Sequence, residues 1–388
     1  MIYFDNAATT RTKPKEVIEA FNYYVTEIGT SPGRGSYSLG IQASRMLYQS
    51  RKTVAKFFGI SNPENVVFTK NSTEGINFFF IGYLKNGDHV IISPYEHNAV
   101  LRPLHKLKEQ GIIDYTVLPE EAIYDAEHHL EKYIRSNTSL IAITLASNLT
   151  GQIVFNTEIS KIANKHNIKM FVDASQGAGK KLLNMQRDGI DVLAFTGHKD
   201  LMALPGVGGI CSQDALNITP LIQGGTGIHG DEYTNPQAYP DSYEAGTLNM
   251  PAIWSLKVAI EIIEKNIEYA SQYESDLLNR LIEGLQRDKN IILYNTDKLR
   301  VPTICFNIQG VPSSEVVSYL DKHGVCVRGG IHCAILAHKQ IGTVETGAVR
   351  VSLNAYNTLE EVEKFIQIIG AQIAIASCNS FQNSNKFR

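Results

Sequence analysis

The chain has 388 residues, enough for two or three domains, and 43% of them are hydrophobic while 19% are charged. This composition is typical of a globular protein and excludes a disordered or fibrous one. The formal net charge of -3 provides no basic surface for nucleic acid or an anionic membrane, so we expect neither as a partner.

The predicted elements alternate between helix and strand through the first two-thirds of the chain. Pro14 suits a first helical turn, and apolar residues follow it at helical spacing. Further helices are predicted over residues 98–110 and 157–166, and apolar runs predict strands at 66–69, 90–93, 140–145, 170–172 and 192–195. Because most of these strands are apolar on both faces, we expect an α/β fold with a mostly parallel sheet covered on both sides.

The pattern changes after Pro251. A long helix is expected there, with Leu256, Ala259, Ile260 and Ile263 on one face, and shorter strands and helices follow it. We therefore predict a second, smaller α+β domain with a boundary near residues 250–260. The polar residues 379–388 predict a flexible tail.

The start of the chain and the cysteines bear on localisation. Residues 1–5 lack the basic and apolar regions of a signal peptide, and the most apolar stretches are too short to span a bilayer. Five cysteines without a repeated spacing argue against a disulfide framework. The sequence therefore predicts a soluble, cytoplasmic protein, and we predict no metal site in it.

An acid and a lysine follow two neighbouring predicted strands. Asp173 ends the strand at 170–172, and Lys199 follows the strand at 192–195. A lysine there is costly unless it is paired or used covalently, although one that simply leaves the sheet into solvent is the alternative. The carboxyl ends of parallel strands line the ligand crevice. The pair therefore fits pyridoxal phosphate, with a Schiff-base lysine and an acid beside the pyridine nitrogen.

Such a cofactor also needs a phosphate site. Ser72 and Thr73 follow the strand at 66–69 and open a predicted helix, whose free N–H groups suit a dianion. Alone, a Ser-Thr pair there is more often only an N-cap. Together with Thr196 and His198 beside the lysine, the pattern favours a phosphate site.

At this point the chain resembles the class V aminotransferase-like, pyridoxal-phosphate-dependent cysteine desulfurases over nearly its whole length. The resemblance rests on these motifs in chain order: Tyr3-Phe4-Asp5-Asn6-Ala7-Ala8-Thr9-Thr10, Ser72-Thr73-Glu74-Gly75-Ile76-Asn77, Glu96-His97-Asn98-Ala99, Val172-Asp173-Ala174-Ser175-Gln176, Thr196-Gly197-His198-Lys199, Glu244-Ala245-Gly246-Thr247-Leu248-Asn249, Arg328-Gly329-Gly330-Ile331-His332-Cys333-Ala334 and Val349-Arg350-Val351-Ser352-Leu353. It implies a fold-type-I enzyme with a large domain of residues 14–254 and a small domain of residues 1–13 and 255–378.

The resemblance also implies the cofactor site. Lys199 is the expected Schiff-base lysine, and Asp173 the partner of the pyridine nitrogen. The remaining ligands implied are Gln176 to the ring oxygen, His97 stacked on the ring and also catalytic, Asn148 to cofactor and substrate, Ser72, Thr73, Thr196 and His198 around the phosphate, and Thr247 from a neighbouring subunit. The last of these implies a homodimer.

Cys333 separates the possible activities. Among the five cysteines it alone lies in a glycine-flanked, polar segment near an arginine, where a thiol is exposed and acidified. Its surroundings resemble those of group II desulfurases and the related selenocysteine lyases. Arg350 matches the residue that holds the substrate carboxylate, although a surface-strand arginine is the alternative. The implied substrate residues are Arg350, Arg328, Asn148 and Ala8.

The expected activity is conversion of L-cysteine to L-alanine, with a persulfide on Cys333 that passes to an acceptor protein. A selenocysteine lyase, another C–S lyase or an aminotransferase of the same fold remain alternatives. A cofactor-free scaffold or sulfur carrier is a further one, which the intact Lys199 and Asp173 argue against. Tyr37 after Arg34-Gly35-Ser36, and Ile331 before His332, stand where the family often has histidine. The sequence leaves open whether the sulfur serves iron–sulfur cluster assembly, tRNA thiolation or selenium metabolism.

Overall fold

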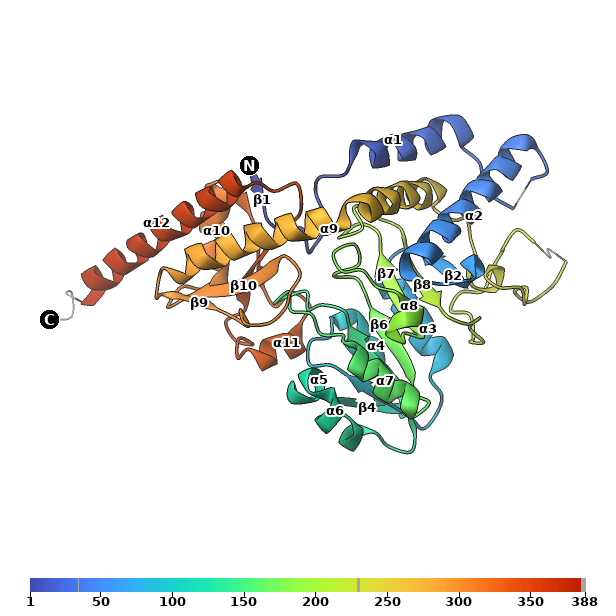
Figure 1. Cartoon of the computed structure of the whole chain (residues 1–388), viewed down its shortest axis with the longest axis horizontal. Helices are drawn as coiled ribbons and strands as arrows, with labels where there is room; N and C mark the ends of the chain where they lie inside the picture. Colours follow the sequence, from blue (N-terminus) through green and yellow to red (C-terminus); the bar gives the residue numbers. More distant parts are fainter. Residues whose placement is uncertain (34, 229–230, 385–388) are drawn as a thin grey trace. The chain divides into compact units, whose positions relative to one another are not determined.

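The computed structural model describes residues 1–33, 35–228 and 231–384, and only the backbone of residues 374–384. The chain forms two compact units (Figure 1). The large unit comprises residues Thr12–Leu145 and Val154–Ile267. The small unit comprises Met1–Arg11, Ala146–Ile153 and Glu268–Arg388.

The large unit is built on a seven-stranded sheet with the strand order β2-β8-β7-β6-β5-β3-β4. The strands are β2 Val66–Thr69, β3 Asp88–Ile92, β4 Ile113–Val117, β5 Thr138–Thr144, β6 Lys169–Asp173, β7 Val192–Thr196 and β8 Gly208–Ser212. Strand β8 is antiparallel to both of its neighbours, β2 and β7, and all the other neighbouring pairs in this sheet are parallel. The predicted α/β fold with a mostly parallel sheet is therefore confirmed.

Strands β4 and β8 were not predicted from the sequence. Strand β8 begins with Gly208 and Gly209, and both positions require glycine because the neighbouring strands approach closely. A Cβ on Gly208 would lie 2.6 Å from the Phe195 carbonyl oxygen. A Cβ on Gly209 would lie 2.6 Å from the Val67 carbonyl oxygen. Because glycine is uncommon in strands, the residues that allow this close packing also weaken the sequence pattern that would predict a strand here.

Helices cover the sheet. They are α1 Lys15–Tyr23, η1 Tyr24–Ile28, α2 Ser38–Phe58, η2 Pro63–Asn65, α3 Ser72–Tyr83, α4 Asn98–Glu109, α5 Glu121–Tyr124, α6 Ala126–His129, η3 Glu131–Tyr133, α7 Thr157–Lys165, α8 Met185–Asp188, η4 Asp241–Tyr243 and the first part of α9 Met250–Gln286. Helix α3 packs against β7 and β8, and α7 packs against β6. The ring centroids of Phe79 and Phe80 of α3 lie 5.3 and 5.1 Å from that of Phe171 on β6, so α3 packs on the sheet. Ser72 at the start of α3 contacts Asp173 at the end of β6, so the N-terminus of the helix lies near the strand ends.

The small unit contains a four-stranded antiparallel sheet of order β12-β13-β10-β9 and a parallel pair of β1 and β11. Its elements are β1 Ile2–Tyr3, β9 Ile291–Leu293, β10 Thr303–Ile308, α10 Ser313–Lys322, β11 Val325–Cys326, β12 Arg328–Gly330, α11 Ile335–Gln340, β13 Ala348–Ser352 and α12 Leu359–Ser384. Phe4, Phe306 and Phe365 lie in its apolar core. This is an α+β unit, as expected.

The structure places two boundaries differently from the sequence-based expectation. The predicted boundary between residues 254 and 255 falls inside α9, which is one continuous helix. Pro251, after which the sequence pattern changes, lies in the first turn of this helix and marks its start. Residues 146–153 also belong to the small unit. The backbone is helical to Ser384, within the segment predicted from residue 379 as a flexible tail, and residues 385–388 lie outside the described part. Within the described residues, no helix is both long and apolar enough to cross a membrane.

Candidate active site

Asp173 lies at the carboxyl end of β6 and is only 2% exposed. Its Oδ1 accepts hydrogen bonds from the Ser175 N–H (2.9 Å), the Ser175 hydroxyl (2.5 Å) and the Ser72 hydroxyl (3.3 Å). The bond from Ser72 also joins the start of α3 to the end of β6, so residues 101 positions apart in the sequence meet at one edge of the sheet.

Lys199 follows the adjacent parallel strand β7, three residues after its last residue, Thr196. The Thr196 hydroxyl is buried and has no hydrogen-bond partner among the described residues. His198 and Lys199 are half-buried in the turn that follows β7. An unpartnered hydroxyl at a strand end next to a lysine is suited to a polar ligand, because leaving it unpaired is costly.

His198 is neutral at neutral pH. Burial, together with the charges of Lys199 and Lys13, lowers the pKa of His198 to about 4. The Nζ of Lys13 donates a hydrogen bond to the His198 carbonyl oxygen (2.9 Å), and burial lowers the pKa of Lys13 to about 8. His198 is thus a neutral ring in a basic environment that suits an anion.

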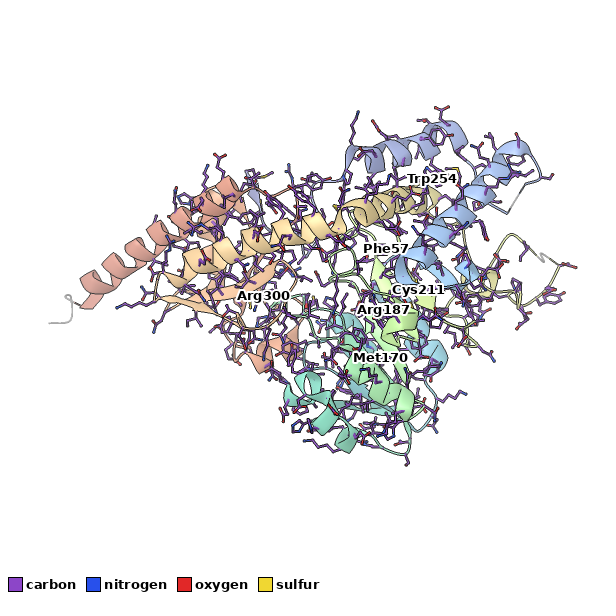
Figure 2. All side chains as sticks on the ribbon, viewed as in Figure 1. Phe57, Met170, Arg187, Cys211, Trp254 and Arg300 are labelled. Atoms are coloured by element: carbon purple, nitrogen blue, oxygen red, sulfur yellow. The ribbon has the colours of Figure 1, made fainter. Side chains whose placement is uncertain are left out.

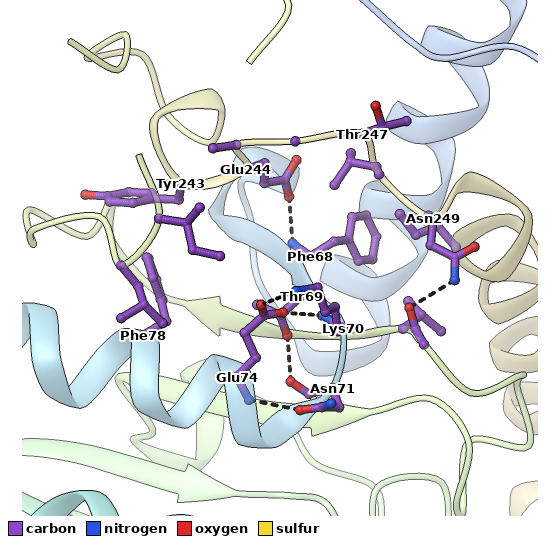
Figure 3. A pocket seen from close by; sticks show the side chains of 18 of the residues that line it. Phe68, Thr69, Lys70, Asn71, Glu74, Phe78, Tyr243, Glu244, Thr247 and Asn249 are labelled. Carbon is purple, nitrogen blue, oxygen red and sulfur yellow. Dashed lines mark hydrogen bonds and ion pairs between the residues drawn. The ribbon is translucent and has the colours of Figure 1, made fainter. Parts of the chain in front are cut away.

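The N-terminus of α3 lies after β2. Asn71 is its N-cap and accepts a hydrogen bond from the Glu74 N–H (2.9 Å), while Glu74 accepts one from the Lys70 N–H (2.6 Å; Figure 3). This reciprocal arrangement resembles a capping box and fixes the first turn. Ser72 and Thr73 occupy that turn, where N–H groups have no partner within a helix. Both expected roles of this segment, N-cap and anion site, are therefore compatible.

His97 follows β3, and Gln176 follows β6, the strand that ends in Asp173. His97 is the N-cap of α4, and its Nδ1 accepts a hydrogen bond from the Ala99 N–H (3.0 Å). This fixes the neutral ring with its proton on Nε2. Gln176 is 3% exposed and follows the Asp173–Ser175 turn.

A cavity of about 470 Å³ lies within the large unit beside the start of α3 (Figure 3). Asn71, His198 and Thr247 are among the residues that line it. Thr247 itself is exposed. Its segment is anchored by Glu244, which forms a buried ion pair with Arg51 and accepts a hydrogen bond from the Phe68 N–H (2.6 Å).

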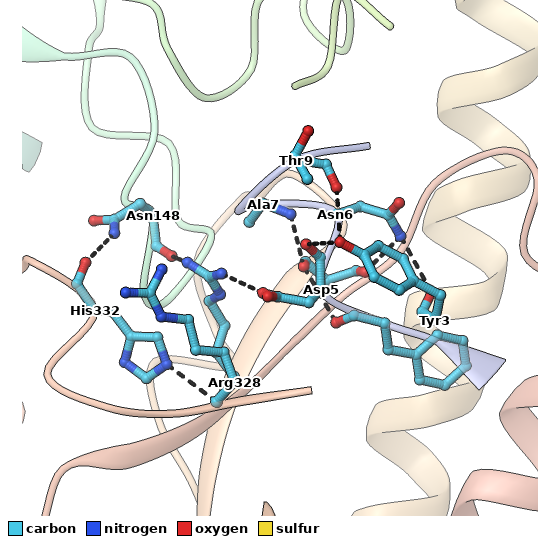
Figure 4. A network of polar contacts seen from close by, with 11 residues as sticks. Tyr3, Asp5, Asn6, Ala7, Thr9, Asn148, Arg328 and His332 are labelled. Carbon is cyan, nitrogen blue, oxygen red and sulfur yellow. Dashed lines mark hydrogen bonds and ion pairs between the residues drawn. The ribbon is translucent and has the colours of Figure 1, made fainter. Parts of the chain in front are cut away.

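The small unit holds a second group of polar residues (Figure 4). Arg350, on β13, is 1% exposed and donates to the Asp5 carboxylate (2.5 Å) and to the Asn148 carbonyl oxygen (2.9 Å). The Asn148 side-chain N–H donates in turn to the His332 carbonyl oxygen (2.7 Å). These bonds connect the guanidinium to the segment that carries Cys333.

Cys333 lies in a turn between β12 and α11, and both it and His332 have left-handed backbone conformations with φ of 56° and 54°. Such conformations are rare for residues other than glycine and need support from their surroundings. Cys333 is half-buried, whereas Cys211 (Figure 2) and Cys305 are fully buried in strands. Burial raises the pKa of Cys305 to about 12 and also raises that of Cys211, so neither thiol ionises readily.

His332 is 4% exposed, and its Nε2 lies 3.1 Å from the Arg328 carbonyl oxygen. Burial, followed by the charge of Arg350, lowers the pKa of His332 to about 3. The ring is therefore neutral, with Nε2 donating. Arg328 itself is exposed on β12, opposite Arg350 on β13.

The predicted site residues fall into two sets. The large unit holds Ser72, Thr73, His97, Asp173, Gln176, Thr196, His198, Lys199 and Thr247, and the small unit holds Ala8, Asn148, Arg328, Cys333 and Arg350. Ala8 is half-buried, and its N–H donates to the Asp5 carbonyl oxygen (3.1 Å). Tyr37 is exposed, whereas Arg34 before it lies outside the described residues.

Sequence reasoning missed several residues that support the two sets. Arg51 lies inside a helix 193 residues before its partner Glu244, so no local pattern indicates it. Asp5 belongs to a quoted motif, but its pairing with Arg350 spans 345 residues. Lys13 has no sequence signal apart from its position just before Pro14.

Comparison with known proteins agrees with this fold and these motifs. The aminotransferase class-V family model matches residues 2–365, and the chain belongs to that family. Its relatives include a probable cysteine desulfurase of Methanothermobacter thermautotrophicus, 33% identical over 93% of this chain and 92% of that protein. Another probable cysteine desulfurase, from Pyrococcus abyssi, is 34% identical over 95% of this chain and 93% of that protein.

Solved structures give the same result. The apo structure of a cysteine desulfurase from Thermococcus onnurineus NA1 matches with a TM-score of 0.87 and 32% identity, covering 96% of this chain and 94% of that one. The Escherichia coli cysteine desulfurase CsdA, in an S-sulfonic acid form, matches with a TM-score of 0.86 and 26% identity over the same shares. The resemblance to class V cysteine desulfurases stated from the motifs is thereby confirmed.

Proposed function

We propose that this protein is a pyridoxal-phosphate-dependent cysteine desulfurase that converts L-cysteine to L-alanine and leaves a persulfide on Cys333. The observation that carries the proposal is the placement of Asp173 and Lys199 at the carboxyl ends of two adjacent parallel strands. A buried acid with three donors is the group that a protonated pyridine nitrogen requires. The names of the relatives point to the same activity.

The chain's own residues fit this cofactor. The unpartnered Thr196 hydroxyl, the neutral His198 ring and the first-turn N–H groups of α3 are suitable donors for its phosphate. Ser72 and Thr73 belong to that turn. Lys199 would hold the cofactor covalently, Asp173 its ring nitrogen, Gln176 its ring oxygen and His97 one face of the ring, with Asn148 contacting both cofactor and substrate. When bound, pyridoxal phosphate supplies the electron-withdrawing ring that makes the substrate's Cα proton acidic.

Arg350 is the proposed site for the substrate carboxylate. Its guanidinium is almost fully buried, and its Nε has no partner among the described residues, so it retains a donor for an incoming oxygen. Asp5 and the Asn148 carbonyl hold the other two nitrogens and fix the plane of the group. Arg328 and Ala8 complete the proposed substrate residues.

Two residues carry the reaction itself. Lys199 removes the proton from Cα of the substrate cysteine. The Cys333 thiolate then attacks the substrate sulfur, so that a sulfur–sulfur bond forms while the Cβ–S bond breaks. The electron pair of the broken bond stays with Cβ, which takes up a proton, and Lys199 returns a proton to Cα, which gives alanine. Cys333 keeps the transferred sulfur as a persulfide.

Product analysis tests this activity. The purified protein is expected to convert L-cysteine to alanine, with one sulfide released per alanine when a thiol reductant is present. Pyruvate and ammonia in place of alanine would identify a different C–S lyase. Turnover of selenocysteine without turnover of cysteine would favour the selenocysteine lyase alternative.

We further propose that the active unit is a homodimer in which Thr247 reaches the phosphate of the neighbouring subunit. Thr247 is exposed, while the Arg51–Glu244 ion pair holds the start of its segment against β2. A segment anchored at one end with a polar side chain free at the other is suited to contact a second chain.

Mixing two defective chains tests the dimer. Lys199→Ala and Thr247→Ala chains, unfolded and refolded together, are expected to recover activity in up to roughly a quarter of the sites, because half of randomly formed dimers are hybrids with one intact site. The two variants refolded separately serve as controls. A mixture no more active than the controls, or a fully active monomer, would contradict a shared site.

We also propose that the protein works in the cytoplasm and passes the persulfide sulfur to an acceptor protein. Cys333 has to be a thiol in order to react, and the cytoplasm keeps thiols reduced. The four cysteines whose side chains the structure describes are all free.

A further inference from the structure

Glu96 is a fully buried acid to which the proposed reaction assigns no role. It lies between β3 and α4, directly before His97, and is 0% exposed. Its Oε1 accepts hydrogen bonds from the Ser93 hydroxyl (2.5 Å) and from the Thr144 N–H (2.7 Å). Its Oε2 is buried and has no hydrogen-bond partner among the described residues.

This unequal pattern bears on the charge of Glu96. An ionised carboxylate in a buried position needs donors for both oxygens, because an uncompensated charge there is very costly. A neutral carboxylic acid carries its proton on one oxygen, so an unpaired Oε2 then costs one unmade hydrogen bond and leaves no uncompensated charge, which is the smaller penalty. The contacts of Glu96 match the neutral acid.

The neighbouring elements reinforce this assignment. Asp173 of β6 is the charged group that acts on Glu96, whereas Ser93 after β3 and Thr144 of β5 contribute hydrogen bonds. Burial raises the pKa of Glu96 to about 8; the hydrogen bonds from Ser93 and Thr144 oppose the shift, and the charge of Asp173 adds to it. Glu96 therefore keeps its proton at pH 7.

The same contacts join three strand ends. Ser93 follows β3, Thr144 is the last residue of β5, and the Leu145 N–H donates to the Asp173 carbonyl oxygen (2.8 Å) at the end of β6. Glu96 thus ties the segment that leads into His97 to the strands that lead to Asp173.

We propose that Glu96 acts as a neutral carboxylic acid that positions the segment carrying His97 against the ends of β5 and β6, beside the charged Asp173. Glu96 is a positioning residue, since it contacts other residues of the chain and no reacting atom. The positioning role of Glu96 rests on the proposed functions of His97 and Asp173, whereas the protonation of Glu96 is independent of them.

Thermal unfolding of wild-type and Glu96→Gln protein between pH 5 and 8 tests the protonation. The folded protein retains the Glu96 proton until the pH approaches the folded-state pKa of about 8, whereas the unfolded chain loses it above the ordinary pKa of 4.5. Wild-type stability should therefore fall with rising pH relative to the variant, which has no proton to lose. We expect the unfolding temperature of Glu96→Gln to exceed that of wild type by a margin that grows from pH 5 to pH 8.

Glu16→Gln, which removes an exposed acid of α1, is the control and should show no such growing margin. A margin for Glu96→Gln that is independent of pH, or that shrinks as pH rises, would overturn the proposal. This measurement does not depend on catalysis, so it separates the protonation of Glu96 from the proposed function.

Turnover of cysteine at pH 7 tests the positioning role. Glu96→Gln keeps an oxygen for Ser93 and Thr144 and should retain activity within about twofold of wild type, whereas Glu96→Ala removes that acceptor and should lose at least about tenfold. Equal losses in both variants would mean that the charge of Glu96 is needed and would overturn the proposal. Full activity in Glu96→Ala would show that Glu96 positions nothing that matters.

Discussion

Replacing Lys199 by alanine is expected to lower the rate of alanine formation from cysteine by about 10⁴-fold, since a positioned acid–base group contributes 10²–10⁴ and the covalent hold on the cofactor is lost as well. Lys199 follows β7 beside the buried Asp173, and no other residue in the proposed reaction takes the Cα proton. Amino-acid analysis of the product, with thermal unfolding as the check on folding, measures the effect.

Lys169→Ala provides a matched control. Lys169 begins β6 at the opposite end from Asp173 and forms an ion pair with Asp191. Its loss removes a lysine from the same sheet without touching the proposed site, so turnover should stay within about twofold of wild type. Near-normal turnover in Lys199→Ala would show that a different group takes the proton.

The second large effect is expected for Cys333→Ala, which should lower alanine formation from cysteine by roughly 10³-fold, because the attacking thiolate is gone. Cys333 is half-buried in a turn, whereas burial raises the pKa of Cys211 and Cys305. Activity on selenocysteine should largely persist, since selenocysteine eliminates selenium with less assistance.

Cys326→Ala is the control for this change. Cys326 is also half-buried, but it lies in β11, where it pairs with Tyr3 of β1. Its replacement should leave alanine formation unaltered. A loss of activity in Cys326→Ala with normal turnover in Cys333→Ala would move the sulfur-accepting role to Cys326.

The central part of the fold could be predicted because its signals are local. The strands that end in Asp173 and Thr196 are short apolar runs, buried on both faces, and each is followed by the polar residues of the site. Strand β4 and strand β8 were missed. In β8 the glycines that allow close packing also weaken the pattern.

The parts that could not be predicted depend on distant partners or on conformation. The burial of Arg350 and its bond to Asp5 depend on how β13 pairs with β10 and β12. The residues near Arg350 in the sequence do not indicate this pairing. The left-handed conformations of His332 and Cys333 occur at residues that ordinarily avoid them. The sequence gives no sign of the proposed neutral state of Glu96, because that state depends on complete burial and on the nearby Asp173.

The persulfide itself provides the most direct test of the proposed reaction. The wild-type protein, incubated with L-cysteine in the absence of a sulfur acceptor and then alkylated, can be digested and its cysteine peptides weighed by mass spectrometry. We predict one additional sulfur on the peptide that contains Cys333, and none on the peptides that contain Cys211, Cys305 or Cys326. Alanine formation with the additional sulfur on the Cys326 peptide, or on no peptide at all, would contradict the assignment of Cys333 as the sulfur acceptor.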